Sequence, residues 1–338
     1  MDAGGRGRLR RAGLRECTLI GYRPAREGYI VIVDAARASS SRSTNILVVG
    51  GGSRAATAFR RYAATKPDLV LTTLMRRPDQ VMGREAIVQT ADYYEPPDDL
   101  LRAADVMINF TGIASGRNKE LLRRVNVDGP LVLATQAKRN GVRQFVQLSS
   151  FHVYGYAEEI SRATIEMPIT PYGRSKLAAD RALLAMQSEE FTVTVFRLPI
   201  LYGRYTGDNL RKLAALIARV GVFPVGPRRN IRSVLHVDNL AILLDAIVRS
   251  RSGGVQFGAD PEPFTIHLLA EVIADRTGRK PRLAPLPDAA FLPLRLLSRG
   301  LYSRICRSNF VKQTDCVVPA APFPVALRDG LKDILPQD

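Results

Sequence analysis

The feature that most constrains the fold is a short apolar run that is followed at once by a glycine turn. Residues 45–49 have the composition of a buried strand, the turn is Gly50-Gly51-Gly52-Ser53, and residues 54–64 are typical of a helix. This order builds a phosphate site, because glycine exposes backbone N–H groups and a helix N-terminus is partly positive. We therefore predict a dinucleotide-binding turn, in which Ser53 narrows the space beside the cofactor. An ordinary glycine turn is the alternative.

Strand-like and helix-like segments alternate through the first half of the chain. Strands are expected at residues 69–74, 86–89, 105–110 and 144–148, and a long helix at 118–140. Alternation with short links predicts an α/β fold, with a Rossmann-like, doubly wound parallel sheet. Ligand-binding groups of such a sheet lie at the carboxyl ends of its strands. The residues expected there are Gly50, Arg76, Asp92, Thr111 and Ser150.

The end of the second strand bears on the choice of cofactor. An NAD site usually has an acidic residue at this place, which holds the ribose 2′-hydroxyl. Here Arg76 and Arg77 follow Met75, and guanidinium groups suit a 2′-phosphate. The pattern favours NADP over NAD and leaves both open.

Tyr172 and Lys176 lie four positions apart in a predicted helix at residues 171–184, so they share one helix face. An ammonium beside a phenol is expected to lower the phenol's pKa toward neutral pH. Ser150, at a strand end, is expected to bind the same substrate oxygen, so that the three residues move a proton on and off an alcohol or carbonyl. The alternative is an exposed helix with a half-buried tyrosine.

The composition is that of a soluble globular protein. Of 338 residues, 46% are hydrophobic and 24% are charged, and no apolar run is long enough to span a bilayer. The three cysteines and three histidines lack metal-ligand spacing, so we predict no metal and a reducing cytoplasm. The net charge of +17 comes mainly from scattered arginines without a nucleic-acid-binding motif, so no nucleic-acid partner is expected.

The domain organisation follows from composition and pattern. Residues 1–43 contain nine arginines and four acidic residues, which predicts a disordered basic leader; a transit-like segment or a misplaced start codon stays open. Within it, residues 30–33 are a candidate short strand. We expect the dinucleotide-binding domain at 44–198 with about 233–250, and a smaller substrate lobe at 199–232 and 251–338.

Several motifs then occur in a characteristic combination. FVQLSS at residues 145–150 precedes VYG at 153–155, and Tyr172 lies 22 positions after Ser150. FRLP at 196–199 precedes LYG at 201–203, and residues 232–238 are RSVLHVD. Together they resemble the extended short-chain dehydrogenases/reductases of the NAD-dependent epimerase/dehydratase family, over about residues 44–335. The resemblance implies an NAD(P)-dependent oxidoreductase or isomerase, a nucleotide-sugar substrate and a homodimer.

The resemblance also implies roles for individual residues. Tyr172 is the acid/base, Lys176 binds the nicotinamide ribose, Ser150 polarises the reacting oxygen, and Asn126 lies below the site. The implied cofactor contacts are Gly50, Gly51, Gly52, Ser53, Arg54, Arg76, Arg77, Asp92, Tyr93, Phe110, Thr111, Gly112, Lys176 and Pro199. The implied substrate contacts are His152, Ile200, Asn209 and Arg232, where Arg232 matches a diphosphate-binding arginine and Ile200 replaces the family's asparagine.

In the second half we expect helices at residues 210–220, 239–248 and 265–277 and a strand at 254–258. The first helix is predicted to carry Leu213, Leu216, Ile217 and Val220 on one face. Residues 289–305 form an amphipathic pattern, with Phe291, Leu294, Leu297, Leu301 and Ile305 between arginines. We interpret it as core packing with a solvated arginine face; contact with an anionic membrane surface, a substrate-lobe cover and a subunit contact stay open.

The function we predict is an epimerase or oxidoreductase at a secondary alcohol or ketone of a nucleotide-activated sugar. An NADPH-dependent ketoreductase is the first alternative. A dehydratase is disfavoured, because the family's dehydratases carry Asp-Glu after the catalytic Ser or Thr, whereas Phe151-His152 follow Ser150. A non-catalytic dinucleotide sensor and a charge-driven nucleic-acid binder are the alternatives from other classes.

Overall fold

A computed structural model describes residues 30–33, 43–114, 118–204, 208–226, 230–297, 302, 307–319 and 321–335. The predicted leader therefore lies outside the described residues except at 30–33 and Ser43. No helix among the described residues is long and apolar enough to cross a membrane.

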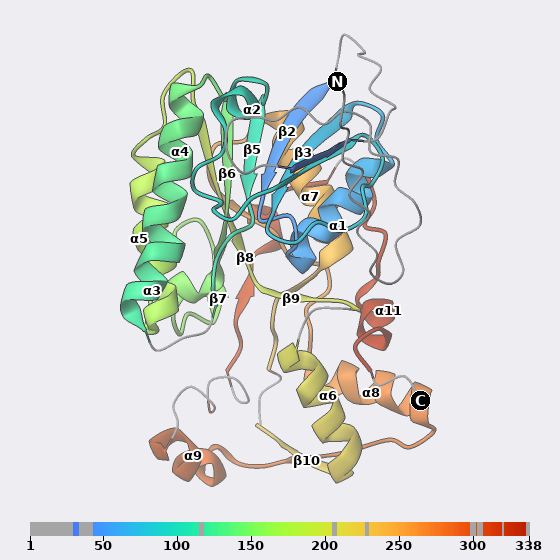
Figure 1. The fold of residues 1–338 in the computed structure, drawn as a ribbon. Helices are drawn as coiled ribbons and strands as arrows, with labels where there is room; N and C mark the ends of the chain where they lie inside the picture. Colours follow the sequence, from blue (N-terminus) through green and yellow to red (C-terminus); the bar gives the residue numbers. More distant parts are fainter. Residues whose placement is uncertain are drawn as a thin grey trace, which may run out of the picture.

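The centre of the molecule is one sheet of eight strands, which confirms the predicted α/β fold (Figure 1). In spatial order the strands are β1 (Ile30–Val33), β4 (Glu85–Gln89), β3 (Leu69–Met75), β2 (Thr44–Val49), β5 (Val106–Asn109), β6 (Gln144–Ser150), β8 (Thr192–Leu198) and β12 (Gly254–Phe257). Seven of them are parallel, and β1 pairs with β4 in the antiparallel direction. The candidate strand in the predicted leader thus forms the edge of the sheet.

Helices cover both faces of the sheet, as Figure 1 shows. The bounds are α1 (Arg54–Ala64) and α7 (Val237–Ser250) on one face, and α2 (Asp98–Arg102), α3 (Lys119–Arg123), α4 (Gly129–Arg139) and α5 (Pro171–Leu184) on the other. Burial on both faces explains why the strands are continuous apolar runs: Leu47 and Val48 belong to the two opposite cores and are both fully buried.

The C-terminal lobe lies beyond the carboxyl ends of the strands (Figure 1). Its elements are β9 (Ile200–Tyr202), α6 (Asp208–Val220), β10 (Val222–Val225), β11 (Val234–His236), α8 (Ile266–Thr277), β13 (Arg282–Pro285), the 3₁₀ turn Asp288–Phe291, α9 (Leu292–Leu297) and α11 (Leu327–Lys332). Strand β9 pairs with β11, and β10 pairs with β13. A separate core of buried side chains, which includes Ile217, Phe223 and Leu269, holds the lobe together.

One prediction about the second half is wrong. The lobe was expected to contain all of residues 251–338, but β12 pairs with β8 in the main sheet. Likewise β14 (Phe310–Val311) pairs with β7 (Glu159–Ile160) beside that sheet. In α6 the buried face contains Leu210, Ala214 and Ile217, because the helix packs on α8 and β10 along that side. Leu216 and Val220 instead remain 48% and 46% exposed.

The amphipathic segment at residues 289–305 also differs from its interpretation as core packing. Phe291 is buried, whereas Leu297 is 87% exposed. Residues 298–301 and 303–306 lie outside the described residues, so Leu301 and Ile305 are not described. The part that the structure describes therefore buries one aromatic side chain and leaves leucine in solvent.

Candidate active site

The glycine turn has the geometry of a phosphate site. Gly50 has φ +84°, a conformation that glycine adopts without strain, and it leads from β2 into α1. Ser53 caps α1, because its Oγ accepts a hydrogen bond from Ala56 N at 3.2 Å. The free backbone N–H groups at such a helix start are the groups that bind phosphate.

The glycines of the turn face different surroundings. A Cβ atom at Gly51 would lie 2.0 Å from Thr73 Cγ2. Thr73 cannot move freely, because its hydroxyl donates to Glu85 Oε1 at 2.6 Å and Glu85 in turn pairs with buried Arg60. A Cβ at Gly52 would have no atom within 4 Å. The turn thus packs against β3 at Gly51 and is open at Gly52, where a pyrophosphate has room to approach.

Beside the turn, the residues after β3 and β4 meet. The Arg76 guanidinium lies 4.9 Å from the centre of the Tyr93 ring, and Arg76 N donates to Tyr93 Oη at 3.2 Å. Arg76 and Arg77 are exposed, and no acidic residue stands in their place at the end of β3. Asp92 Oδ1 accepts from Tyr94 N at 2.8 Å, which fixes the turn between β4 and α2.

Asn126 lies inside a π-helical segment (Arg124–Asp128) between α3 and α4. Single π turns are frequent at functional sites. Its side chain is fully buried and exchanges hydrogen bonds with the backbone of Ile113, at 2.9 Å and 3.0 Å. Asn126 Nδ2 also donates to Ser175 Oγ at 3.0 Å, so Asn126 links the loop after β5 to α5.

The loop after β5 carries the predicted contacts Phe110, Thr111 and Gly112. The Thr111 hydroxyl donates to Asn109 Oδ1 at 2.7 Å, which holds the loop against the strand end. A Cβ at Gly112 would lie 3.4 Å from Asn126 Oδ1 and 3.9 Å from Lys176 Nζ. Because glycine has no side chain, the backbone of this loop can lie close to both Asn126 and Lys176.

Helix α5 begins and ends where the sequence predicts. Pro171 occupies its first turn, and Thr170 caps it by accepting from Gly173 N at 3.0 Å. Gly173 is required for close packing, because a Cβ there would lie 2.4 Å from the carbonyl oxygen of His152. This contact fixes α5 against the turn after β6 and brings Tyr172 to Ser150.

Ser150, His152 and Tyr172 form one cluster at the carboxyl end of β6. Ser150 Oγ lies 3.0 Å from His152 Nδ1, and Ser150 is near enough to Tyr172 to lower the pKa of its phenol. The His152 and Tyr172 rings pack edge to face, with centroids 5.3 Å apart. His152 itself is exposed, so the predicted substrate-side histidine does lie beside the predicted catalytic tyrosine.

The protonation equilibria differ from the prediction. Burial raises the pKa of Tyr172, and the nearby Ser150 side chain offsets only part of that increase. Burial also lowers the pKa of Lys176 to about 8, against the opposing effect of the Asp180 carboxylate. The prediction that Lys176 lowers the pKa of Tyr172 is therefore wrong for this structure, because the buried surroundings favour the neutral form of both groups.

A buried polar network behind the cluster was missed by the sequence analysis. Asp180 Oδ2 accepts from Ser149 Oγ at 2.9 Å and from Arg197 Nε at 3.0 Å. Arg197 also donates to Tyr154 Oη at 2.6 Å and to Glu166 Oε1 at 2.7 Å. The available signal was spacing: Asp180 lies four positions after Lys176 on the same helix face. The network ties α5 to β6 and β8.

The predicted substrate contacts lie mostly in the lobe. Arg232 forms bridge pairs with Phe264 and Asn309, and its guanidinium donates to Asn230 Oδ1 at 3.1 Å and to Arg307 O at 3.1 Å. Half-buried Ile200 pairs with Val234 and packs against the lobe core, one residue after Pro199. The side chain of Asn209 lies outside the described residues.

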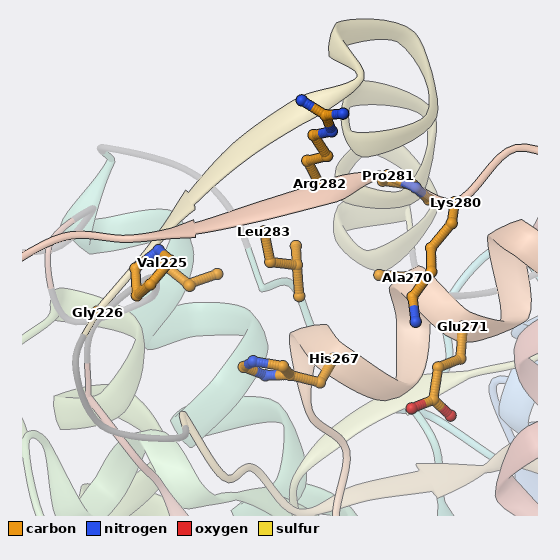
Figure 2. A pocket seen from close by; sticks show the side chains of 10 residues that line it. Val225, Gly226, His267, Ala270, Glu271, Lys280, Pro281, Arg282 and Leu283 are labelled. Carbon is orange, nitrogen blue, oxygen red and sulfur yellow. The ribbon is translucent and has the colours of Figure 1, made fainter.

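The lobe contains a pocket of about 840 Å³ that none of the predicted site residues lines. Figure 2 shows Leu283 of β13 pointing toward His267 on α8, whereas Arg282 points to the other side of the strand. Among the residues that the structure describes, no cluster of His, Cys, Asp and Glu could hold a metal ion.

Comparison with known proteins decides the family. Residues 25–259 match the profile of the NAD dependent epimerase/dehydratase family, which is more than half of the chain. The chain belongs to this family. Its enzymes include NAD-dependent epimerases, dehydratases and reductases that act on nucleotide sugars.

Individual relatives agree with this membership. The chain is 32% identical over 256 residues to the "Uncharacterized protein y4nL" of Sinorhizobium fredii, covering 67% of this chain and 71% of that protein. It is 31% identical over 130 residues to the UDP-glucose 4-epimerase of Vibrio cholerae, covering 37% and 40%. The structure of the UDP-glucuronic acid 4-epimerase from Bacillus cereus in complex with NAD matches with a TM-score of 0.68 at 14% identity, covering 86% and 97%; this likeness shows the fold.

Proposed function

We propose that the protein is an NAD(P)-dependent epimerase or oxidoreductase of a nucleotide-activated sugar, with Tyr172 as the acid/base at a secondary alcohol or ketone. One observation carries the proposal: Ser150, His152 and Tyr172 form one cluster at the same sheet edge as the open glycine turn. Lys176 and Asn126 approach the loop after β5 at that edge. The family membership and the NAD bound in the epimerase from B. cereus support the proposal.

The residues at the sheet edge fit a dinucleotide. The turn at Gly50–Ser53 would hold the pyrophosphate, the paired Arg76 and Tyr93 would border the adenosine, and Lys176 would bind the nicotinamide ribose. A bound nicotinamide would supply reversible hydride transfer and, when oxidised, a positive charge beside the phenol. Asn126 would keep the loop and α5 at a fixed separation, because it is bonded to both.

In this proposal Tyr172 Oη exchanges a proton with the oxygen of the reacting carbon, while Ser150 Oγ donates a hydrogen bond to that oxygen. The raised pKa of Tyr172 keeps the phenol protonated, which suits proton donation to a ketone. Proton removal from an alcohol requires a nearby positive charge, and protonated Lys176 contributes one. His152 lies at the open side of Ser150 and would relay the proton to solvent.

Epimerisation is the version that best agrees with the relatives named above. A ketoreductase is the second candidate, because exposed Arg76 and Arg77 suit the 2′-phosphate of NADPH. In either version Arg232 and Asn209 would bind the diphosphate and the nucleotide sugar. Ile200 would present an apolar surface where the family has an amide, so we expect a sugar with a deoxy or less polar group there.

The test uses the full-length protein with UDP- and dTDP-hexoses and their 4-keto derivatives, each with NAD(H) or NADP(H). Matched free hexoses without the nucleotide are the control. Conversion without net consumption of cofactor supports epimerisation, whereas stoichiometric oxidation of NADPH supports the ketoreductase. If the protein binds a dinucleotide but converts none of these sugars, the substrate class is wrong. The expected homodimer is a separate prediction, which light scattering tests.

A further inference from the structure

The end of the lobe farthest from the central sheet exposes an unusual number of apolar side chains. Seven of the thirteen large apolar side chains that are exposed in the described residues belong to α6, β10, α9 and the loop after β13. These elements lie together at that end of the molecule (Figure 1). The most exposed members are Leu296 and Leu297 of α9, at 77% and 87%.

We define the distal surface by these apolar side chains and the basic side chains between them. Its apolar residues are Leu216, Val220, Val222, Leu286, Leu292, Leu296 and Leu297. Its basic residues are Arg219, Arg279, Lys280, Arg282 and Arg295. Residues 219–226 and 279–297 contain these five basic residues and one acidic residue, Asp288. The distal surface is therefore both apolar and positively charged.

The lobe core does not account for these apolar residues. In α6, Ile217 enters the core while Leu216 and Val220 point away from it. In β10, Phe223 and Val225 are buried while Val222 is 54% exposed. Both α6 and β10 thus have one side that packs into the lobe core and an opposite, outer side that is also apolar. The outer side would reduce solubility unless something covers it.

Within the part of the chain that the structure describes, the basic side chains of the distal surface also lack acidic partners. Among the described residues, Arg219, Arg279, Lys280, Arg282 and Arg295 form no ion pair with a carboxylate. By contrast, Arg328 on α11 pairs with Glu271 and Asp275 in the same lobe. The positive charges beside the exposed leucines are therefore available to an external anionic surface.

We propose that the distal surface binds peripherally to the anionic face of a lipid membrane. Exposed leucine and valine would enter the boundary between headgroups and acyl chains, while the arginines contact phosphate groups. The mixture argues for lipid over nucleic acid, which would bind the charges and leave the leucines in water. The catalytic cluster on α5 and β6 lies beside the central sheet, away from this surface, and so stays accessible in the bound state.

The test is co-sedimentation of the full-length protein with vesicles of phosphatidylcholine alone or with phosphatidylglycerol. We expect binding only to vesicles that contain phosphatidylglycerol, and weaker binding at high salt. The double variant Leu296→Asp/Leu297→Asp should lose at least about tenfold in binding, because it removes apolar contacts and adds negative charge. Each of Arg282→Gln and Arg295→Gln should lose about fivefold, the effect of one charge near an anionic surface.

The matched control is Ile165→Asp/Val318→Asp, because these side chains are 79% and 83% exposed but lie on other segments. The control should bind like the unmodified protein, and all variants should keep their thermal midpoints and nucleotide binding. Equal loss in the control and the α9 variant would overturn the proposal, as would equal binding to neutral vesicles. Absence of vesicle binding, with dimers that dissociate in Leu296→Asp/Leu297→Asp, would assign the surface to a second copy of the chain instead.

Discussion

Around α5, the charged side chains of Asp180 and Arg197 are buried and paired, whereas at the distal surface apolar side chains lie in solvent. Asp180 and Arg197 are 0% and 2% exposed, and Arg197 binds three partners. Leu296 and Leu297, in contrast, are mostly exposed. Buried charge is tolerated only with fixed partners, so it holds the reacting groups in one arrangement. The exposed surface carries no such constraint and suits contacts with other molecules.

This contrast suggests a division of roles within the chain. The interior around α5 holds the groups that would exchange protons, and a small displacement there affects both packing and chemistry. The lobe provides the surfaces that would select the sugar and the membrane, and substitutions there should change affinity with little effect on folding. The predictions below test this division, from the largest effect to the smallest.

The largest effect is expected for Tyr172→Phe, which removes only the phenol oxygen. Turnover of an accepted sugar should fall by about 10³-fold, because general acid–base catalysis contributes on that order. Dinucleotide affinity should stay unchanged, since the ring and its packing against His152 remain. Steady-state rates together with calorimetric titration of the cofactor measure both. A variant that keeps full turnover would leave Tyr172 without a catalytic role and would favour a non-catalytic dinucleotide sensor.

Substitutions in the buried polar network of Asp180 and Arg197 should lower the stability of the protein. Asp180→Asn leaves buried Arg197 without its carboxylate partner, so the free energy of unfolding should fall by about 3–5 kcal/mol. The matched control is Asp275→Asn, which removes one carboxylate from the exposed pair with Arg328 and should produce no measurable change. Denaturant unfolding compares them. If the two variants lost the same free energy of unfolding, the buried network would be no more important for stability than the exposed ion pair in the lobe.

Alanine substitutions at Gly51 and Gly52 should have different effects, the first on protein stability and the second on dinucleotide binding. Gly51→Ala forces a Cβ against Thr73 and should cost about 1–3 kcal/mol of stability without any ligand. Gly52→Ala meets no protein atom, so its thermal midpoint should be unchanged while dinucleotide affinity falls. Thermal unfolding with and without NAD distinguishes these outcomes. Unaltered NAD binding in Gly52→Ala would argue that the pyrophosphate lies elsewhere.

The smallest effect concerns pH. Lys176 has its pKa lowered to about 8 by burial, so its positive charge is present below pH 8 and is lost as the pH rises above it. In the direction of alcohol oxidation, which needs this charge, the rate should therefore fall above pH 8, by about tenfold per unit at most. Lys176→Arg stays protonated throughout this range, so its residual activity should lack that decrease. Persistence of the same decrease in the arginine variant would assign it to another group.

Much of the nucleotide-binding half could be predicted because its signals are local. Pro171 and the capping Thr170 specify the start of α5, and the apolar run at residues 45–49 with three glycines specifies the first strand and turn. The alternation of strand and helix then leaves few topologies. The positions of Ser150 and Tyr172 at one sheet edge follow from that topology and from the resemblance.

What could not be predicted depends on contacts between distant segments. Strand β12 pairs with β8 some 60 residues away, for instance Gly254 with Thr194, and its sequence is equally suited to a lobe strand. The buried side of α6 could not be predicted, because Leu210, Leu213, Leu216, Ile217 and Val220 offer more than one apolar stripe. The pKa directions at Tyr172 and Lys176 depend on burial, which spacing along a helix does not reveal.

The most direct test of the central claim is native mass spectrometry of the purified full-length protein, alone and with added NAD(H) or NADP(H). The account predicts one dinucleotide per chain, either retained through purification or taken up on addition, and weaker uptake by Gly52→Ala. Retained NAD would favour epimerisation, and selective uptake of NADPH would favour the ketoreductase. If the folded protein binds neither dinucleotide at millimolar concentration, the proposed reaction at Tyr172 is contradicted.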